Sequence, residues 1–156
     1  VVDMSVETMA RLFQLKNIVG VKDATGDLDR VDKQKKLMGP DFIQLSGEDG
    51  TALEFNLRGG VGCISVTANV ATKLCSEFQE ASIAKNNSNL LSKAKEINEK
   101  LKPLHKSLFI ESNPSPVKYA AKLLNLCDDS VRLPLVKVTD TTKEIVKKAL
   151  HSANLL

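Results

Sequence analysis

The chain has 156 residues, of which 42% are hydrophobic and 26% are charged; this composition is typical of a globular domain and excludes a disordered chain. Only 4% of the residues are aromatic, the net charge is only +3, and acidic residues interrupt the basic stretches. We therefore expect no nucleic-acid partner. No apolar run approaches the roughly 18 residues of a membrane span, so we also expect no membrane partner.

Strands and helices alternate along the first half of the sequence. In chain order the pattern predicts a helix over 5–15, a strand over 18–21, a helix over 27–38, a strand over 42–45, a helix over 51–58 and a strand over 63–66. Such alternation predicts right-handed βαβ units and a parallel sheet. The pattern alone leaves open a doubly wound sheet or a (β/α)8 barrel.

After about Ala71 the strand patterns stop. One predicted helix carries Leu74 and Phe78, and the others cover residues 90–108, 116–124 and 141–150. Pro103 is expected to kink the long helix, and Thr141 with Glu144 matches a capping box that opens the last one. The second half of the chain is therefore predicted to be helical.

Lys22 is the first candidate for chemistry. It ends an apolar strand, and strand alternation places it on the same face as Ile18 and Gly20, with Gly20 leaving room beside it. Removal of a lysine from water favours the neutral amine, which is the form that attacks a carbonyl to give a Schiff base. A lysine that simply ends its strand in water has the same pattern, so both interpretations stay open.

The other two predicted strands also end in small and polar residues, at 46–49 and 65–69. This convergence indicates a site more strongly than any single residue does, because parallel strands present their carboxyl ends at one edge. Glu48 and Asp49 could form a general-base or metal pair, but adjacent carboxylates at such a turn more often cap the helix. We therefore expect no metal site.

Several other features are given structural interpretations. His105 and His151 lie on predicted helices without a nearby nucleophile and are expected to be core or surface histidines. The glycine-rich segment 59–62 precedes a strand and lacks the lysine of a phosphate-binding loop. The three cysteines are widely spaced and are expected to be reduced thiols, which favours a cytoplasmic location.

Six segments together closely resemble the dihydrodipicolinate synthase family, within the wider group that includes N-acetylneuraminate lyases. They are GVKDATG (20–26), LSGED (45–49), GGVGCISVTANV (59–70), LKPLH (101–105), NPSPVK (113–118) and RLP (132–134). The likeness covers essentially the whole chain, in order and without large gaps.

The resemblance implies an α/β fold: part of a (β/α)8 barrel, strands 6–8 with their helices, over residues 1–85, and a helical C-terminal domain over 86–156 used in assembly as a homotetramer. It implies a lyase of the class I aldolase type that condenses pyruvate with aspartate semialdehyde in the diaminopimelate route to lysine. Lys22 would form the Schiff base, and Gly47 and Ile64 would line the substrate site. No metal or organic cofactor is implied, because the imine itself accepts the electrons.

The chain departs from the family in what it lacks. A complete barrel has about 250 residues and eight strands, whereas this chain is expected to supply three and to begin after the family's fifth strand. The family's threonine pair that holds the pyruvate carboxylate, its proton-relaying tyrosine and the arginine for the second substrate belong to the missing part. Tyr119 matches no catalytic motif and cannot replace that tyrosine. Because three strands leave open edges, we expect the chain to fold poorly alone.

Three hypotheses follow. The first is the C-terminal portion of a synthase from a split or truncated gene, with a separately encoded N-terminal half as its partner. The second is a non-catalytic remnant or assembly module. The third keeps the Schiff-base chemistry with another substrate, as in N-acetylneuraminate lyase or keto-deoxy sugar-acid aldolases; segments 45–49 and 113–118 favour the synthase.

Overall fold

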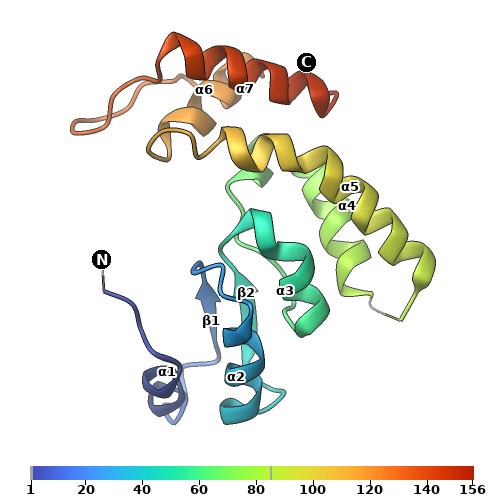
Figure 1. Cartoon of the computed structure of the whole chain (residues 1–156). Coiled ribbons are helices and arrows are strands. Elements are labelled where there is room, and N and C mark those ends of the chain that lie inside the picture. Colours follow the sequence, from blue (N-terminus) through green and yellow to red (C-terminus); the bar gives the residue numbers. More distant parts are fainter. Residues whose placement is uncertain (1, 85) are drawn as a thin grey trace.

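The computed structural model describes residues 2–84 and 86–156, with a small parallel sheet and its helices in the first half and a bundle of helices in the second (Figure 1). In chain order the elements are α1 (Val6–Leu12), β1 (Gly20–Asp23), α2 (Asp29–Met38), β2 (Ile43–Ser46), the 3-10 turn η1 (Asp49–Thr51), α3 (Ala52–Arg58), the 3-10 turn η2 (Thr67–Asn69), α4 (Thr72–Ile83), α5 (Ser88–Ser107), α6 (Ser115–Leu123) and α7 (Asp140–Ser152). The predicted α/β class is confirmed.

The sheet has fewer regular strands than the sequence pattern predicts. β1 and β2 pair in parallel, but the segment that follows α3 forms only a single bridge to β2, between Ser46 and Cys63. The predicted strand over 63–66 was therefore wrong in its extent. Its second half leaves the sheet because the Val66 N–H donates to Asp49 at 2.9 Å and Val66 already has helical dihedral angles.

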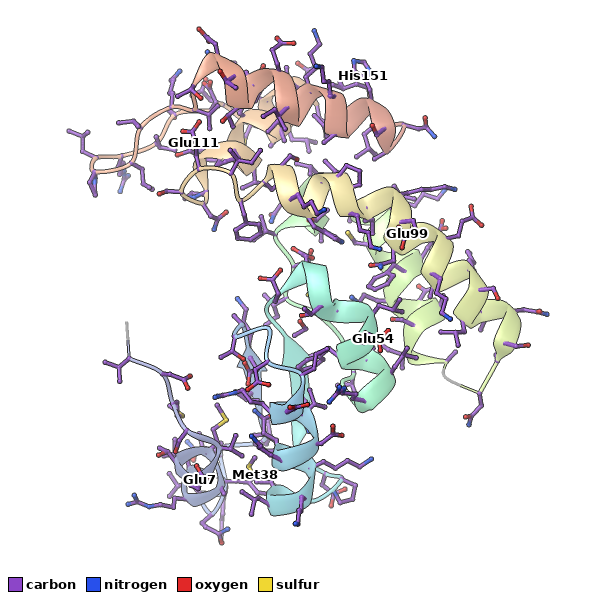
Figure 2. All side chains as sticks on the ribbon, in the orientation of Figure 1. Glu7, Met38, Glu54, Glu99, Glu111 and His151 are labelled. Carbon is purple, nitrogen blue, oxygen red and sulfur yellow. The ribbon has the colours of Figure 1, made fainter. Side chains whose placement is uncertain are left out.

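Helices α1 and α2 pack against each other beside the sheet. Ser5 caps α1, as predicted, by accepting the Thr8 N–H at 3.1 Å, although the helix ends at Leu12 instead of near residue 15. Met38 at the end of α2 lies between the two helices (Figure 2) and belongs to a small buried apolar cluster. This cluster holds α1 against the end of α2.

The last helix begins at a different residue from the one predicted. The N-cap of α7 is Thr139, whose hydroxyl oxygen accepts the Thr142 N–H, so the predicted capping box at Thr141 was wrong. The partner of Thr139 is Glu111, from the loop after α5 (Figure 2), and its Oε1 accepts both the Thr139 N–H at 3.0 Å and the Thr139 hydroxyl at 2.8 Å. A carboxylate distant in sequence thus replaces the local glutamate of a capping box.

The main hydrophobic core lies among helices α3 to α7 (Figure 1). Leu101 and Leu104 of α5 and Leu108, which directly follows this helix, are fully buried and share this core with Leu150 of α7. Pro103 lies inside α5 without ending the helix. No helix within 2–84 or 86–156 is both long and apolar enough to cross a membrane.

Candidate functional site

Lys22 lies on the face of the sheet opposite α2. The parallel register places Lys22 directly across from Leu45, so their side chains share one face. The next residue in β2 toward its N-terminus, Gln44, faces the other way, and its Nε2 donates to the Val31 carbonyl of α2 at 3.2 Å. Lys22 therefore points away from the helix-covered side, as strand alternation predicted.

Lys22 is one of the residues that line an open concave surface of about 410 Å³. Its apolar lining includes Ile43 and Leu45 from β2 and Ile64 from the segment beside it, and Ile43 and Ile64 are 45% and 52% exposed. Lys22 itself is exposed, so the described residues do not by themselves remove its amine from water. The desolvation that favours a neutral amine needs further walls.

Gly47 makes room for the Lys22 side chain. A Cβ atom built at Gly47 would lie 2.7 Å from Lys22 Cε and 2.7 Å from Ala24 Cβ, which is closer than real Cβ contacts. The Gly47 N–H also donates to the Asp23 carbonyl at 2.7 Å and so ties the end of β2 to the end of β1. The structure thus brings the predicted residues Lys22 and Gly47 together and places Ile64 on the same concave surface.

Asp23 anchors the strand that carries Lys22, and the sequence analysis did not identify it. This buried carboxylate accepts hydrogen bonds from Thr25, from Arg30 Nε at 2.7 Å and from Gln34 Nε2 at 3.0 Å. Burial by itself raises the pKa of Asp23, but the bonds from Thr25 and Arg30 outweigh burial and hold the pKa below its ordinary value. The signal in the sequence is the spacing of four between Arg30 and Gln34, which places both on one helix face.

The two adjacent carboxylates after β2 have separate structural roles. Glu48 accepts the Gly50 N–H at 3.0 Å and caps η1, so the capping interpretation is confirmed for Glu48 and was wrong for Asp49. Asp49 is buried, and its two oxygens accept hydrogen bonds from residues 65–67. Among the described residues no group of three or more His, Cys, Asp or Glu side chains is placed to hold a metal ion.

The histidines and cysteines take structural positions. His105 is buried, with its Nδ1 2.8 Å from the Thr67 hydroxyl, whereas His151 is exposed, so the core-or-surface interpretation is confirmed. Burial lowers the pKa of His105 and is only partly opposed by Asp49 and Glu48. Burial also raises the pKa values of Cys63 and Cys75 to about 12, so both thiols stay protonated and unreactive.

Comparison with known proteins connects this geometry to one family. The model of the family described as Dihydrodipicolinate synthetase matches residues 1–153. The chain is 72% identical over 156 residues to the 4-hydroxy-tetrahydrodipicolinate synthase of Pelagibacter ubique (strain HTCC1062), covering all of this chain and 53% of that protein. Its identity to the synthase of Parvibaculum lavamentivorans is 57%, covering 52% of that protein. The chain thus spans about half the length of these relatives.

Solved structures give the same result. The dihydrodipicolinate synthase from Acinetobacter baumannii, described as chloride-inhibited and complexed with pyruvate, superposes with a TM-score of 0.92 at 42% identity, over 99% of this chain and 52% of that one. A structure described as the first monomeric dihydrodipicolinate synthase variant superposes with a TM-score of 0.89 at 37% identity, over 97% of this chain and 50% of that one.

Proposed function

Because this chain belongs to the dihydrodipicolinate synthetase family, we propose that it provides the Schiff-base lysine of a 4-hydroxy-tetrahydrodipicolinate synthase. In this function Lys22 binds pyruvate and directs its condensation with L-aspartate 4-semialdehyde. Relatives at 72% and 57% identity carry that synthase name, which favours this substrate pair over a sugar-acid aldolase. Gly47 and Ile64 line the substrate site, and no metal or cofactor takes part.

The observation that carries the proposal is the placement of Lys22 over Gly47, on the apolar face of the parallel sheet. A lysine whose side chain extends into water at the end of a strand does not require a glycine next to its Cε atom. Apolar neighbours such as Leu45 and Ile64 suit an amine that must be neutral to react, once the remaining walls exclude water. The packing of Lys22 against Gly47 and its apolar neighbours therefore supports a nucleophilic role for this lysine once further walls complete the pocket.

The proposed chemistry follows from the amine. The neutral Lys22 nitrogen attacks the keto carbon of pyruvate, and loss of one water molecule leaves a protonated imine. Loss of a proton from the pyruvate methyl carbon then moves an electron pair toward the imine nitrogen and gives an enamine. That carbon attacks the aldehyde carbon of the semialdehyde, and the aldehyde oxygen takes up a proton to become the hydroxyl group. The amine of the semialdehyde then displaces the Lys22 nitrogen at the imine carbon, which closes the ring of 4-hydroxy-tetrahydrodipicolinate and frees the Lys22 amine. By the family resemblance, the groups that move protons and hold the carboxylate come from an N-terminal half.

The same proposal gives the chain a partner. The two strands and the bridged segment are strands 6–8 of a (β/α)8 barrel within residues 1–85, and residues 86–156 form the helical domain used in homotetramer assembly. The N-terminal half that the relatives have and this sequence does not include supplies the first five strands, in the cytoplasm. The exposed apolar side chains on the Lys22 face, including Ile43 and Ile64, support such a partner because an uncovered apolar face is unfavourable in water.

Reductive trapping tests the proposal. The chain is mixed with the part of the Pelagibacter ubique synthase that it does not match, and pyruvate and borohydride are added. We expect one reduced pyruvyl group per chain, on Lys22 by peptide mass spectrometry, and turnover of the semialdehyde. Lys22→Arg abolishes the adduct, because a guanidinium forms no imine, whereas Lys16→Arg, at an exposed lysine ahead of the strand, leaves it unchanged. A folded mixture without the adduct identifies a non-catalytic remnant instead.

A further inference from the structure

Asp49 connects two segments that line the proposed pyruvate site. It lies two residues after Gly47 in the chain, and it is only 5% exposed. Its Oδ2 accepts the N–H of Val66 at 2.9 Å and of Thr67 at 3.1 Å, and its Oδ1 accepts the Ser65 hydroxyl. One buried carboxylate thus binds the three residues that directly follow Ile64.

The two bonds from the adjacent N–H groups of Val66 and Thr67 meet at one Asp49 oxygen and so fix the local path of the backbone. They also stand at the point where the chain leaves the sheet, since the Ile64 N–H still donates to the Ser46 carbonyl of β2 at 2.8 Å. The backbone of Ile64 is therefore held from both sides, by β2 before the turn and by Asp49 after it.

A second buried contact connects the segment after Ile64 to the helical half of the chain. The Thr67 hydroxyl lies 2.8 Å from Nδ1 of His105 in α5, and both residues are buried. The segment after Ile64 is therefore fixed through its backbone to Asp49 and through its side chain to α5. The remaining freedom of this segment is small only while Asp49 accepts its N–H groups.

We propose that Asp49 is a positioning residue for the Schiff-base site, holding Gly47 and Ile64 at the spacing that Lys22 and bound pyruvate require. The inference rests on the proposed function of Lys22. Asp49 touches no reacting atom; it acts through the backbone of β2 and of the bridged segment, which lie beside the strand of Lys22. Loss of the Asp49 carboxylate should therefore weaken pyruvate binding. It should have a smaller effect on imine formation by Lys22 once pyruvate is bound.

The test compares Asp49→Ala, Asp49→Asn and Asp129→Ala in the full chain, prepared with the same N-terminal half. Asp129 is a matched control because it is a buried carboxylate that accepts bonds from Lys122 and Lys137 in the helical half. We expect Asp49→Ala to raise the pyruvate concentration for half-maximal trapping about tenfold or more, with full trapping at saturation. Asp49→Asn keeps an acceptor for Val66 and Thr67 and should restore most of the affinity. Asp129→Ala should leave the pyruvate dependence unchanged.

A second measurement separates this inference from the function on which it rests. Amide hydrogen exchange of residues 64–67 and 47 should become at least about tenfold faster in Asp49→Ala, while exchange in α6 and α7 stays as in the wild type. If the wild type gives no adduct, the function of Lys22 fails and exchange alone decides the role of Asp49. Unchanged exchange at these amides, or an unchanged half-saturating pyruvate concentration in folded Asp49→Ala, overturns the inference.

Discussion

A methyl group at position 47 would occupy the space that the Lys22 side chain uses, because a Cβ atom there lies 2.7 Å from Lys22 Cε and from Ala24 Cβ. We expect Gly47→Ala to lower the rate of pyruvate trapping about tenfold, the equivalent of a modest overpacking cost. Gly50→Ala is the control, since its Cβ meets only the end of the Glu48 carboxylate at 3.2 Å. Equal trapping rates in the two variants would contradict the close contact between Gly47 and Lys22.

His105 makes the fold sensitive to acid. Burial lowers its pKa below the ordinary 6.5, so the unfolded chain binds a proton between these two values and the folded chain does not. The free energy of unfolding is therefore unaffected above about pH 6.5 and falls as the pH drops below it. We expect His105→Gln to show a smaller loss of urea midpoint between about pH 7.5 and about pH 5.5 than the wild type. The control variant His151→Gln, at an exposed histidine, should lose as much urea midpoint as the wild type does. If His105→Gln also loses as much as the wild type, His105 is not the source of the acid sensitivity.

The residues that sequence reasoning reached are those with a recognisable local motif. Lys22 follows from its strand end and from the family resemblance, Gly47 and Ile64 follow as site residues from the resemblance alone, and the structure brings Lys22 against Gly47. Asp23 is signalled only indirectly, by the spacing of its partners Arg30 and Gln34, whereas the structural importance of Asp49 was out of reach because its partners lie up to 18 residues away in the chain. A pattern of residue types at short spacing does not show which distant N–H groups will donate to a given carboxylate.

At the scale of elements, α7 is stabilised at its start by Thr139. An N-cap threonine replaced by alanine costs about 1 kcal/mol, so Thr139→Ala should lower the free energy of unfolding by about that amount. Thr141, which the sequence pattern favours as the cap, lies exposed within the first turn of α7, and Thr141→Ala should change stability by less than about 0.5 kcal/mol. Chemical denaturation of both variants measures the difference. A larger loss of stability in Thr141→Ala than in Thr139→Ala would instead support the capping box at Thr141.

The element order was predictable because apolar periodicity and turn residues are local. The predicted helices and the first two strands are present, with ends displaced by a few residues. The third strand was predicted too long because the apolar run after Gly62 is by itself typical of a strand. In the structure the N–H groups of Val66 and Thr67 donate to Asp49 instead of to a neighbouring strand. Strand length thus depends on a tertiary contact that the run itself does not encode.

At the scale of the whole molecule, the Lys22 face of the sheet is its most consequential open surface. Ile43 is 45% exposed and Ile64 is 52% exposed on the concave surface around Lys22. Apolar surface beside a short open sheet favours association with whatever strand or apolar face is available. Without its proposed partner the chain should therefore self-associate, and with the partner the same surface should be buried.

A double substitution separates these two consequences. Ile43→Lys with Ile64→Lys places charge on this surface, so we expect less self-association of the chain alone and also a loss of assembly with the N-terminal half, because burying an unpaired charge is costly. Leu133→Lys is the control, since Leu133 is 86% exposed in the loop before α7, away from the sheet, and should leave assembly unchanged. Sedimentation velocity of each chain, alone and mixed, measures both properties. If the double variant assembles as tightly as the wild type, the N-terminal half does not bind this face, and the placement of these strands inside a shared barrel is wrong.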